Sequence, residues 1–115
     1  MKIANKLIRG SVGDYWFFRD GKLSNEALEF YDQLSEEGVV LVFIGYATIS
    51  DYDQYDDSGV FRIDKDEYIE EYKKVTSIIH KNNRKVIMES IHMGDQTSTK
   101  TTNKLYAPNN KSNIK

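Results

Sequence analysis

Six consecutive apolar residues stand between two glycines in the first half of this 115-residue chain. The run at residues 39–44, VVLVFI, shows no alternation and is rich in β-branched residues, with Gly38 before it and Gly45 after it. Strands buried on both faces have this pattern, and they occur mainly in parallel sheets covered by helices. A short buried helix is the alternative, but six residues between two glycines are too few to form one. The run therefore predicts a central strand of a parallel sheet.

The segment before this run is predicted to be a helix. Ser24 is a suitable N-cap, because its hydroxyl can accept a hydrogen bond from a free backbone N–H of the first turn. Residues at helical spacing are predicted to form its inner face: Ala27, Leu28, Tyr31 and Leu34. Gly38 is placed to end the helix in a left-handed conformation, and Asp20 with Gly21 predicts a turn before it.

A second helix is predicted to begin at Asp64. This residue stands three positions before Glu67, as in an aspartate variant of the capping box. Residues at helical spacing are predicted to form the inner face: Ile69, Tyr72, Val75, Thr76 and Ile79. Asn82 and Asn83 can end this helix, because asparagine tolerates the left-handed conformation.

Two more strands complete the predicted order of strand, helix, strand, helix, strand. They are a very short buried strand at residues 7–8 and a strand at residues 86–91, and residues 46–63 are expected to form a long loop. Helices between apolar strands imply right-handed crossovers and a parallel sheet. The strand starts are roughly 30 to 50 residues apart, which is compatible with an eight-fold barrel of about 250 residues.

The expected fold class is therefore α/β, a partial (β/α)8 TIM barrel of two to three βα units with parallel strands. Residues 1–94 are expected to form this barrel segment. Residues 95–115 consist mainly of Thr, Asn, Ser and Lys, and we expect a polar tail that is extended or disordered, because it offers almost nothing to bury.

Composition excludes several classes of function. The absence of cysteine excludes disulfides, thiolate zinc sites and cysteine nucleophiles. The formal net charge of -2 gives no basic face for nucleic acid. The longest apolar run is far too short to span a membrane, and the N-terminus lacks the apolar segment of a signal peptide. Neither GxGxxG nor GxxxxGK occurs. We therefore expect a soluble cytoplasmic protein that binds neither nucleic acid nor membrane.

An acidic loop, two histidines and an aromatic cluster are further candidates for a binding site. The acidic loop contains Asp51, Asp53, Asp56 and Asp57. It fails the calcium-loop pattern, because its sixth and twelfth positions are Asp56 and Arg62 instead of Gly and Glu. His80 is expected on the surface at a helix end and His92 at a strand end, and two histidines so placed do not make a metal site. The aromatic cluster at residues 14–16 is either core or a ligand-stacking group.

Three segments carry a resemblance to a known family. DGKLSNEALEFYDQLSEEGVVLVFIGYATIS contains a turn, a capped helix and a Gly-Val-rich strand that ends in Gly-Tyr. IDKDEYIEEYKKVTSIIHKNNRKVIMESIHMGDQT contains a helix, a strand and a His-x-Gly turn, and TTNKLYAP follows it. They lie within residues 5–108, over which the order and gaps of these segments resemble the FMN-dependent oxidoreductases of the Old Yellow Enzyme (NADH:flavin oxidoreductase) family.

The resemblance implies a TIM barrel with FMN at the C-terminal ends of its strands. It implies that Ser11 and Val12 run beside the flavin ring and that Gly45 lets backbone approach the polar edge of the flavin. Glu89 would occupy the position where the family usually has a Gln that bonds the pyrimidine part of the ring. Three residues depart from the family. Val12 replaces Thr or Cys and cannot donate a hydrogen bond, Glu89 only accepts when ionised, and Asp95 replaces an Arg.

The family holds the FMN phosphate, the substrate carbonyl and the proton donor on later strands, which would lie beyond Lys115. We therefore predict no catalytic residue and no metal ligand in this chain, with FMN and NAD(P)H as the ligands that the resemblance implies, and no activity of the chain alone. The alternative is a non-catalytic remnant, or half of a split barrel that needs a complementary fragment or self-association, because an open sheet leaves an unpaired edge. An unrelated small α/β binding module is the third hypothesis.

Overall fold

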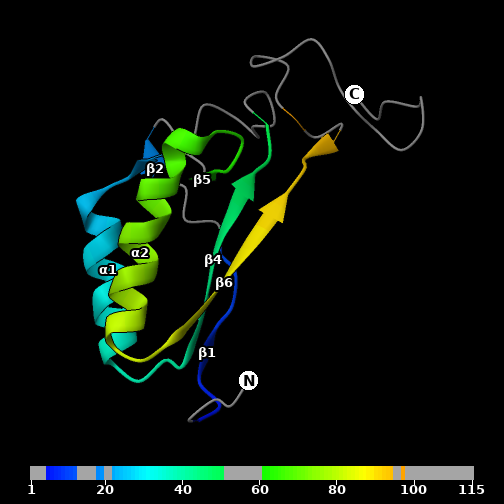
Figure 1. Cartoon of the computed structure of the whole chain (residues 1–115). Helices are drawn as coiled ribbons and strands as arrows, with labels where there is room; N and C mark the ends of the chain where they lie inside the picture. The colour runs from blue at the N-terminus through cyan, green and yellow to red at the C-terminus, as the bar shows by residue number, and fades with distance from the viewer. Residues whose placement is uncertain (1–4, 13–17, 20–21, 51–60, 95–96, 98–115) are drawn as a thin grey trace.

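Two helices cover one face of a small sheet whose paired strands run mostly parallel (Figure 1). The computed structural model describes residues 5–12, 18–19, 22–50, 61–94 and 97. The elements in chain order are β1 (Ile8–Arg9), β2 (Phe18–Arg19), β3 (Lys22–Leu23), α1 (Asn25–Glu36), β4 (Leu41–Thr48), β5 (Phe61–Arg62), the 3-10 turn η2 (Asp66–Tyr68), α2 (Ile69–Lys81) and β6 (Lys85–Ile91). The predicted α/β class with parallel strands and two helices is confirmed.

Strand β4 is the centre of the sheet. It pairs in parallel with β1, where Ile8 lies opposite Leu41, and with β6 along most of its length, beginning with Leu41 opposite Lys85. The short strand β5 also pairs in parallel with the end of β4. Within the described residues these strands form an open sheet, which does not close into a barrel.

The first strand differs from its prediction. It is present as β1 but shifted by one residue, and the predicted burial is wrong, because Leu7 and Ile8 are 54% and 45% exposed. The physical reason is that β1 pairs with β4 on one side only in the described part of the chain. A separate antiparallel ribbon of β2 and β3 brackets residues 20–21. The predicted turn at Asp20 and Gly21 agrees with that pairing but lies outside the described residues.

Helix α1 forms as predicted. The Ser24 hydroxyl oxygen accepts a hydrogen bond from the backbone N–H of Ala27 at 3.1 Å, which satisfies one donor of the first turn. Ala27 and Tyr31 are fully buried on its inner face. Gly38 has a φ of +99°, so the chain leaves the helix through a conformation that favours glycine.

Strand β4 is longer than predicted. It continues through Gly45 to Thr48, so the expected loop at residues 46–63 begins too early, and it also contains the short strand β5. A β-bulge explains the error, because the pairing jumps from Ile44 opposite Met88 to Ala47 opposite Ser90. Two residues of β4 therefore lie opposite one residue of β6. Gly45 therefore lies at the bulge, and the strand continues past it.

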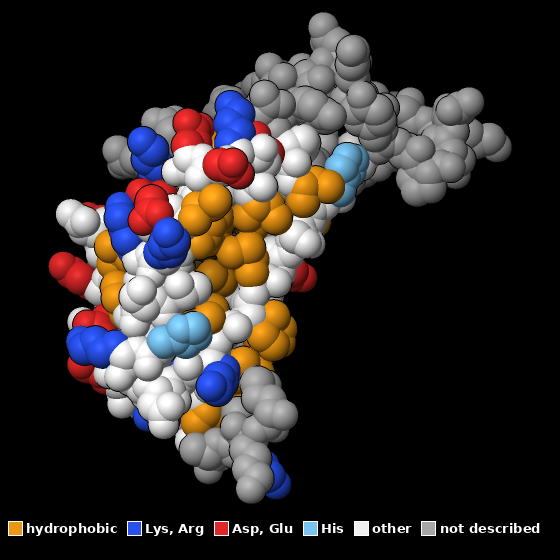
Figure 2. Space-filling view, viewed as in Figure 1, with side chains coloured by type: hydrophobic (Ala, Val, Ile, Leu, Met, Phe, Trp, Pro, Cys, Tyr) orange, Lys and Arg blue, Asp and Glu red, His pale blue; other side chains and the backbone are white. Residues whose placement is uncertain are grey.

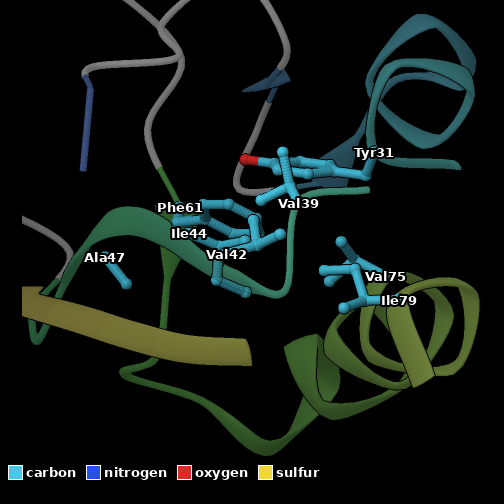
Figure 3. Close-up of a cluster of buried hydrophobic side chains, with 8 residues drawn as sticks. All are labelled: Tyr31, Val39, Val42, Ile44, Ala47, Phe61, Val75 and Ile79. Carbon is cyan, nitrogen blue, oxygen red and sulfur yellow. The ribbon is translucent and has the colours of Figure 1, made fainter. Parts of the chain in front are cut away.

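The bulge also decides which side chains of β4 enter the core. Val42 and Ile44, before the bulge, are buried toward the helices. Ala47, after the bulge, is buried on the same side, so the alternation between inward and outward side chains shifts by one residue. The core cluster consists of Tyr31, Val39, Val42, Ile44, Ala47, Phe61, Val75 and Ile79 (Figure 3). It therefore joins both helices to the central strand.

The start of the second helix is not capped as predicted. Asp64 instead accepts two hydrogen bonds from Arg62, at 2.9 Å from Nε and 2.6 Å from Nη2. The helical segment begins two residues later with η2, whose first turn has no side-chain cap. The predicted Asp64 cap is wrong because the guanidinium two residues earlier engages both carboxylate oxygens.

The inner face of α2 is only partly as predicted. Val75 and Ile79 are fully buried, and Tyr72 and Thr76 are half-buried, but Ile69 is 47% exposed because it stands at the first position of the helix. Asn83 has a φ of 57°, which confirms the predicted left-handed end. The strand predicted at residues 86–91 is present as β6 and starts one residue earlier.

A half-buried polar cluster joins the end of α1 to the turn between α2 and β6. The Asn82 amide donates to Ser35 Oγ at 2.7 Å and to Asp32 Oδ1 at 3.2 Å. Arg84 Nε donates to the Ser35 carbonyl oxygen at 3.0 Å. These contacts join segments nearly fifty residues apart in sequence, so they hold the two βα units together at one end.

The division into a barrel segment at residues 1–94 and a tail at residues 95–115 stays a prediction. Apart from Thr97, the predicted tail lies outside the described residues. In the described part of the chain, no helix has the length and apolar character needed to cross a membrane.

Shortening a buried side chain of α2 tests this packing. We expect Ile79→Ala to lower the free energy of unfolding by about 2–5 kcal/mol, because it leaves a cavity between α2 and β4. Ile69→Ala, in the same helix but largely exposed, should change it by less than about 0.5 kcal/mol. Urea denaturation followed by circular dichroism measures both values, and equal losses would contradict the assigned inner face.

The Arg62–Asp64 pair predicts a dependence of stability on pH. Hydrogen bonding from Arg62 lowers the pKa of the Asp64 carboxyl from its ordinary value of 3.8. A carboxyl with a lower pKa in the folded state adds stability above its unfolded pKa, and this stability is lost as pH falls through the folded pKa. We therefore expect the free energy of unfolding to decrease below about pH 4.

Asp64→Asn should make that decrease shallower, and Asp66→Asn, an exposed residue of η2, should leave it unchanged. Urea denaturation at a series of pH values gives the slopes. Identical slopes for Asp64→Asn and the unsubstituted chain would show that the pair adds no pH-dependent stability.

Candidate functional site

A hollow of about 370 Å³ lies on the sheet between the end of β1 and the middle of β6. Its lining residues are Gly10, Ser11, Phe43, Ile87, Met88 and Glu89. The pairing shows which face of the sheet this is. Val42 and Ile44 point to the helices and pair with Val86 and Met88, so Phe43 and Ile87 point to the other face. We call this second face, which α1 and α2 do not cover, the open face.

Three of the four residues implied by the family resemblance come together here. Ser11 and Glu89 both line the hollow, although 78 positions separate them in the sequence. Gly45 lies directly against Glu89, because a methyl group added at Gly45 would come within 2.7 Å of the Glu89 carbonyl oxygen. Val12 follows Ser11 in the chain but is 56% exposed and is not among the lining residues. The roles of all four stay predictions.

Sequence reasoning missed the apolar wall of the hollow. Phe43 and Ile87 supply this wall from the open face, and Met88, whose place on β6 directs its side chain to the helix side, also borders the hollow. The sequence could have indicated the place of Phe43. It stands between Val42 and Ile44, and if these two enter the core, Phe43 must point to the other face of the strand. The pairing of Phe43 with Ile87 could not be read from the sequence, since it depends on the register of two strands far apart in the chain.

The lining of the hollow carries one acidic side chain, Glu89, and no basic one. The nearest cation on β1, Arg9, is used on the helix side of the sheet. Its Nη1 donates to the Phe43 carbonyl oxygen at 2.7 Å, and its guanidinium lies 5.4 Å from the ring centre of Phe30 and 5.6 Å from that of Tyr31. The hollow can therefore hold a flat apolar group with hydrogen-bonding atoms at its edge better than it can hold an anion.

The other candidate groups do not form a second site in the described residues. His80 is exposed near the end of α2, and His92 Nδ1 accepts a hydrogen bond from the Gly94 N–H at 2.9 Å, which closes the predicted His-x-Gly turn. The acidic loop and the aromatic cluster at residues 14–16 lie outside the described residues. In the part of the chain that the structure describes, no three His, Cys, Asp or Glu side chains are grouped to hold a metal ion.

Comparison with known proteins gives one kind of match. No protein-family model matches the chain, and no curated protein matches it in sequence. A crystal structure of the Old Yellow Enzyme TcOYE with pHBA superimposes with a TM-score of 0.73 over 86% of this chain, at 18% sequence identity. The chain has the fold of a part of TcOYE. It spans only 26% of the TcOYE chain, so the likeness shows the fold and leaves the activity to be proposed.

A substitution at Gly45 tests how closely β4 and β6 approach each other at the bulge. We expect Gly45→Ala to lower the free energy of unfolding by about 1–3 kcal/mol or more, because φ at Gly45 is +132° and the new methyl group would meet the β6 backbone. Gly10→Ala lines the same hollow but meets nothing within 4 Å, so it should be close to neutral. Thermal and urea denaturation compare the two, and a neutral Gly45→Ala would contradict the described bulge.

Proposed function

We propose that this chain forms the flavin-ring side of an FMN-dependent oxidoreductase of the Old Yellow Enzyme type. The observation that carries the proposal is the hollow on the open face. Ser11 and Glu89 line it and Gly45 lies against the backbone of Glu89; these are positions that the sequence resemblance assigns to the flavin, on a fold similar to part of TcOYE. The sequence resemblance supports the place of the ring, and the fold likeness supports the type of scaffold.

The residues present fit the ring of FMN but not its phosphate. Phe43 and Ile87 provide apolar contact for a flat aromatic group on the open face. The Ser11 hydroxyl can donate or accept a hydrogen bond, and the Glu89 carboxylate can accept one from an N–H of the pyrimidine part of the ring. No Lys or Arg is among the lining residues, so a phosphate would have to be held by other groups.

The cofactor carries the chemistry in such enzymes, and the protein positions it. When bound, FMN supplies hydride transfer from NAD(P)H to an acceptor. Phe43 and Ile87 exclude water from one face of the hollow, and Gly45 packs closely against the backbone of Glu89, whose side chain lines the hollow. None of these residues donates or removes a proton in the proposal, so we assign no catalytic residue.

Glu89 makes the proposal specific. An ionised carboxylate disfavours negative charge beside it, and reduced FMN is negatively charged. Glutamine has the same shape, can both donate and accept, and has no charge. The substitution Glu89→Gln should therefore strengthen flavin binding if the ring occupies this hollow.

A second candidate function is flavin binding without catalysis, by a half that needs further strands. The exposure of Ile87 (39%) and Met88 (36%) in the middle of β6 favours it, because side chains at such positions are normally covered. In this case FMN binds but NADH is not oxidised. An unrelated small α/β binding module would show no flavin binding at all.

We would titrate FMN and riboflavin into the purified chain and follow flavin fluorescence. We expect saturable binding with a dissociation constant of about 1–100 μM, and about equal affinity for the two ligands because the lining holds no phosphate-binding cation. Glu89→Gln should bind the oxidised flavin about three- to tenfold more tightly, because the amide can both donate to and accept from the pyrimidine edge of the ring. Glu36→Gln, at the exposed end of α1, is the matched control and should not change binding.

Absence of saturable binding in folded protein would overturn the proposal. Saturable binding that Glu89→Gln does not alter would place the ring elsewhere. If binding is seen, the rate of NADH oxidation by the FMN-loaded chain separates the oxidoreductase from the binding-only half.

A further inference from the structure

The outer edge of β6 has no partner strand among the described residues. One edge pairs with β4, and all seven residues of β6 are exposed or half-exposed. The direction of its backbone groups follows from one hydrogen bond, in which the Lys85 N–H donates to the Val40 carbonyl oxygen at 3.0 Å. Because N–H and C=O groups alternate in direction along a strand, those of Val86 and Met88 point to the free edge.

The side chains of β6 have a symmetric charge pattern. Lys85, Ile87 and Glu89 stand at alternate positions, so they share the open face with the apolar residue in the centre. If a second β6 pairs with the first in antiparallel fashion about Ile87, each Lys85 lies opposite Glu89 of the second copy. The two isoleucines then lie opposite each other. The strand is therefore complementary to itself in charge.

We propose that two copies of this chain associate through the free edges of β6, antiparallel and with a two-fold axis at Ile87. A two-fold axis makes the contact use the same surface on both copies, so the assembly closes as a dimer. The inference does not rest on the proposed flavin function, because it depends only on the edge of β6 and its charges.

The backbone pattern agrees with this register. Val86 lies opposite Met88 of the second copy, and both have their N–H and C=O groups directed outward, so they form hydrogen-bonded pairs. Ile87, Lys85 and Glu89 fall at the non-hydrogen-bonded positions, where opposite side chains are closer to each other. Moving the axis by one residue to Met88 would put Ile87 opposite Glu89 and Lys85 opposite Ile91, so both charge pairs would be lost.

Apolar surface is removed from water in the same contact. Ile87 and Met88 are among the exposed large apolar residues of the chain, and Figure 2 shows apolar side chains gathered between α2 and β6. Met88 also lines a second hollow of about 370 Å³ between α2 and β6, together with Ile69 and Tyr72. Val86 of the second copy would pack beside Met88, and the two sheets would become one continuous sheet.

The test is the mass of the full chain, measured by light scattering after size exclusion over a range of protein concentrations. We expect a change from one chain to two as concentration rises. Lys85→Glu and Glu89→Lys should each weaken the dimer by about tenfold, because like charges then face each other at both symmetry-related pairs. The double variant Lys85→Glu/Glu89→Lys should restore the dimer, since it only exchanges the two charges.

Circular dichroism of each variant shows whether it is folded. A restored dimer of the double variant could not result from unfolding, so it separates a charge effect from a loss of structure. A chain that stays monomeric at every concentration would overturn the proposal, because the free edge of β6 would then not pair with a second copy. A dimer that neither single charge reversal weakens would overturn the β6 contact.

A cysteine variant tests the axis directly. The chain contains no cysteine, so Ile87→Cys introduces a single thiol that would lie opposite its own copy, within about 4.5–5.5 Å between Cβ atoms. We expect mild oxidation to yield a covalent dimer of Ile87→Cys after the small adjustment that a disulfide requires. Val12→Cys, which is more exposed (56% against 39%) but is not part of β6, should stay monomeric, and equal cross-linking of the two would contradict the axis.

Discussion

The structure depends on the burial of β4. This strand has parallel partners on both edges and two helices over one face, and Val42 and Ile44 have no exposed surface. A parallel pair needs a crossover connection, so both helices must return the chain to the same end of the sheet. The packing of Tyr31, Val75 and Ile79 on β4 therefore fixes where α1 and α2 lie, and with them the start of β6.

The two faces of the sheet have different roles as a result. The helix side holds the buried core, with the polar contacts of Asn82 and Arg84 with Ser35 at one end of it. The open face carries Phe43, Ile87 and Glu89 with little over them in the described part of the chain. A surface with both apolar and hydrogen-bonding groups, on a rigid strand pair, is suited to binding a flat ligand or another strand. The flavin proposal concerns the open face of this sheet, and the dimer proposal concerns the free edge of β6.

Local signals in the sequence were sufficient to predict most elements. The Ser24 cap, the apolar run at residues 39–44 and the left-handed end at Asn83 each act within a few residues, so the sequence shows them directly. The Asp64 cap failed because Arg62 competes for the same carboxylate. The sequence predicts that the strand ends at Gly45, since it cannot show that β6 passes close beside this residue. The site positions came from family resemblance, and its apolar wall needed the strand register, which only the folded chain defines.

The bulge in β4 has a consequence for how the gene can change. Because Gly45 and Tyr46 together lie opposite a single residue, the residues beyond them face the helices in the opposite phase from those before them. Loss of one codon between Ile44 and Ala47 would restore a plain ladder in which Ala47 still lies opposite Ser90 and faces the helices. In a regular part of the strand the same loss would turn every later side chain to the other face of the sheet. The bulge thus holds one extra residue without exchanging the inside and the outside of the strand end, so this short stretch should accept the loss of one residue more readily than the rest of β4.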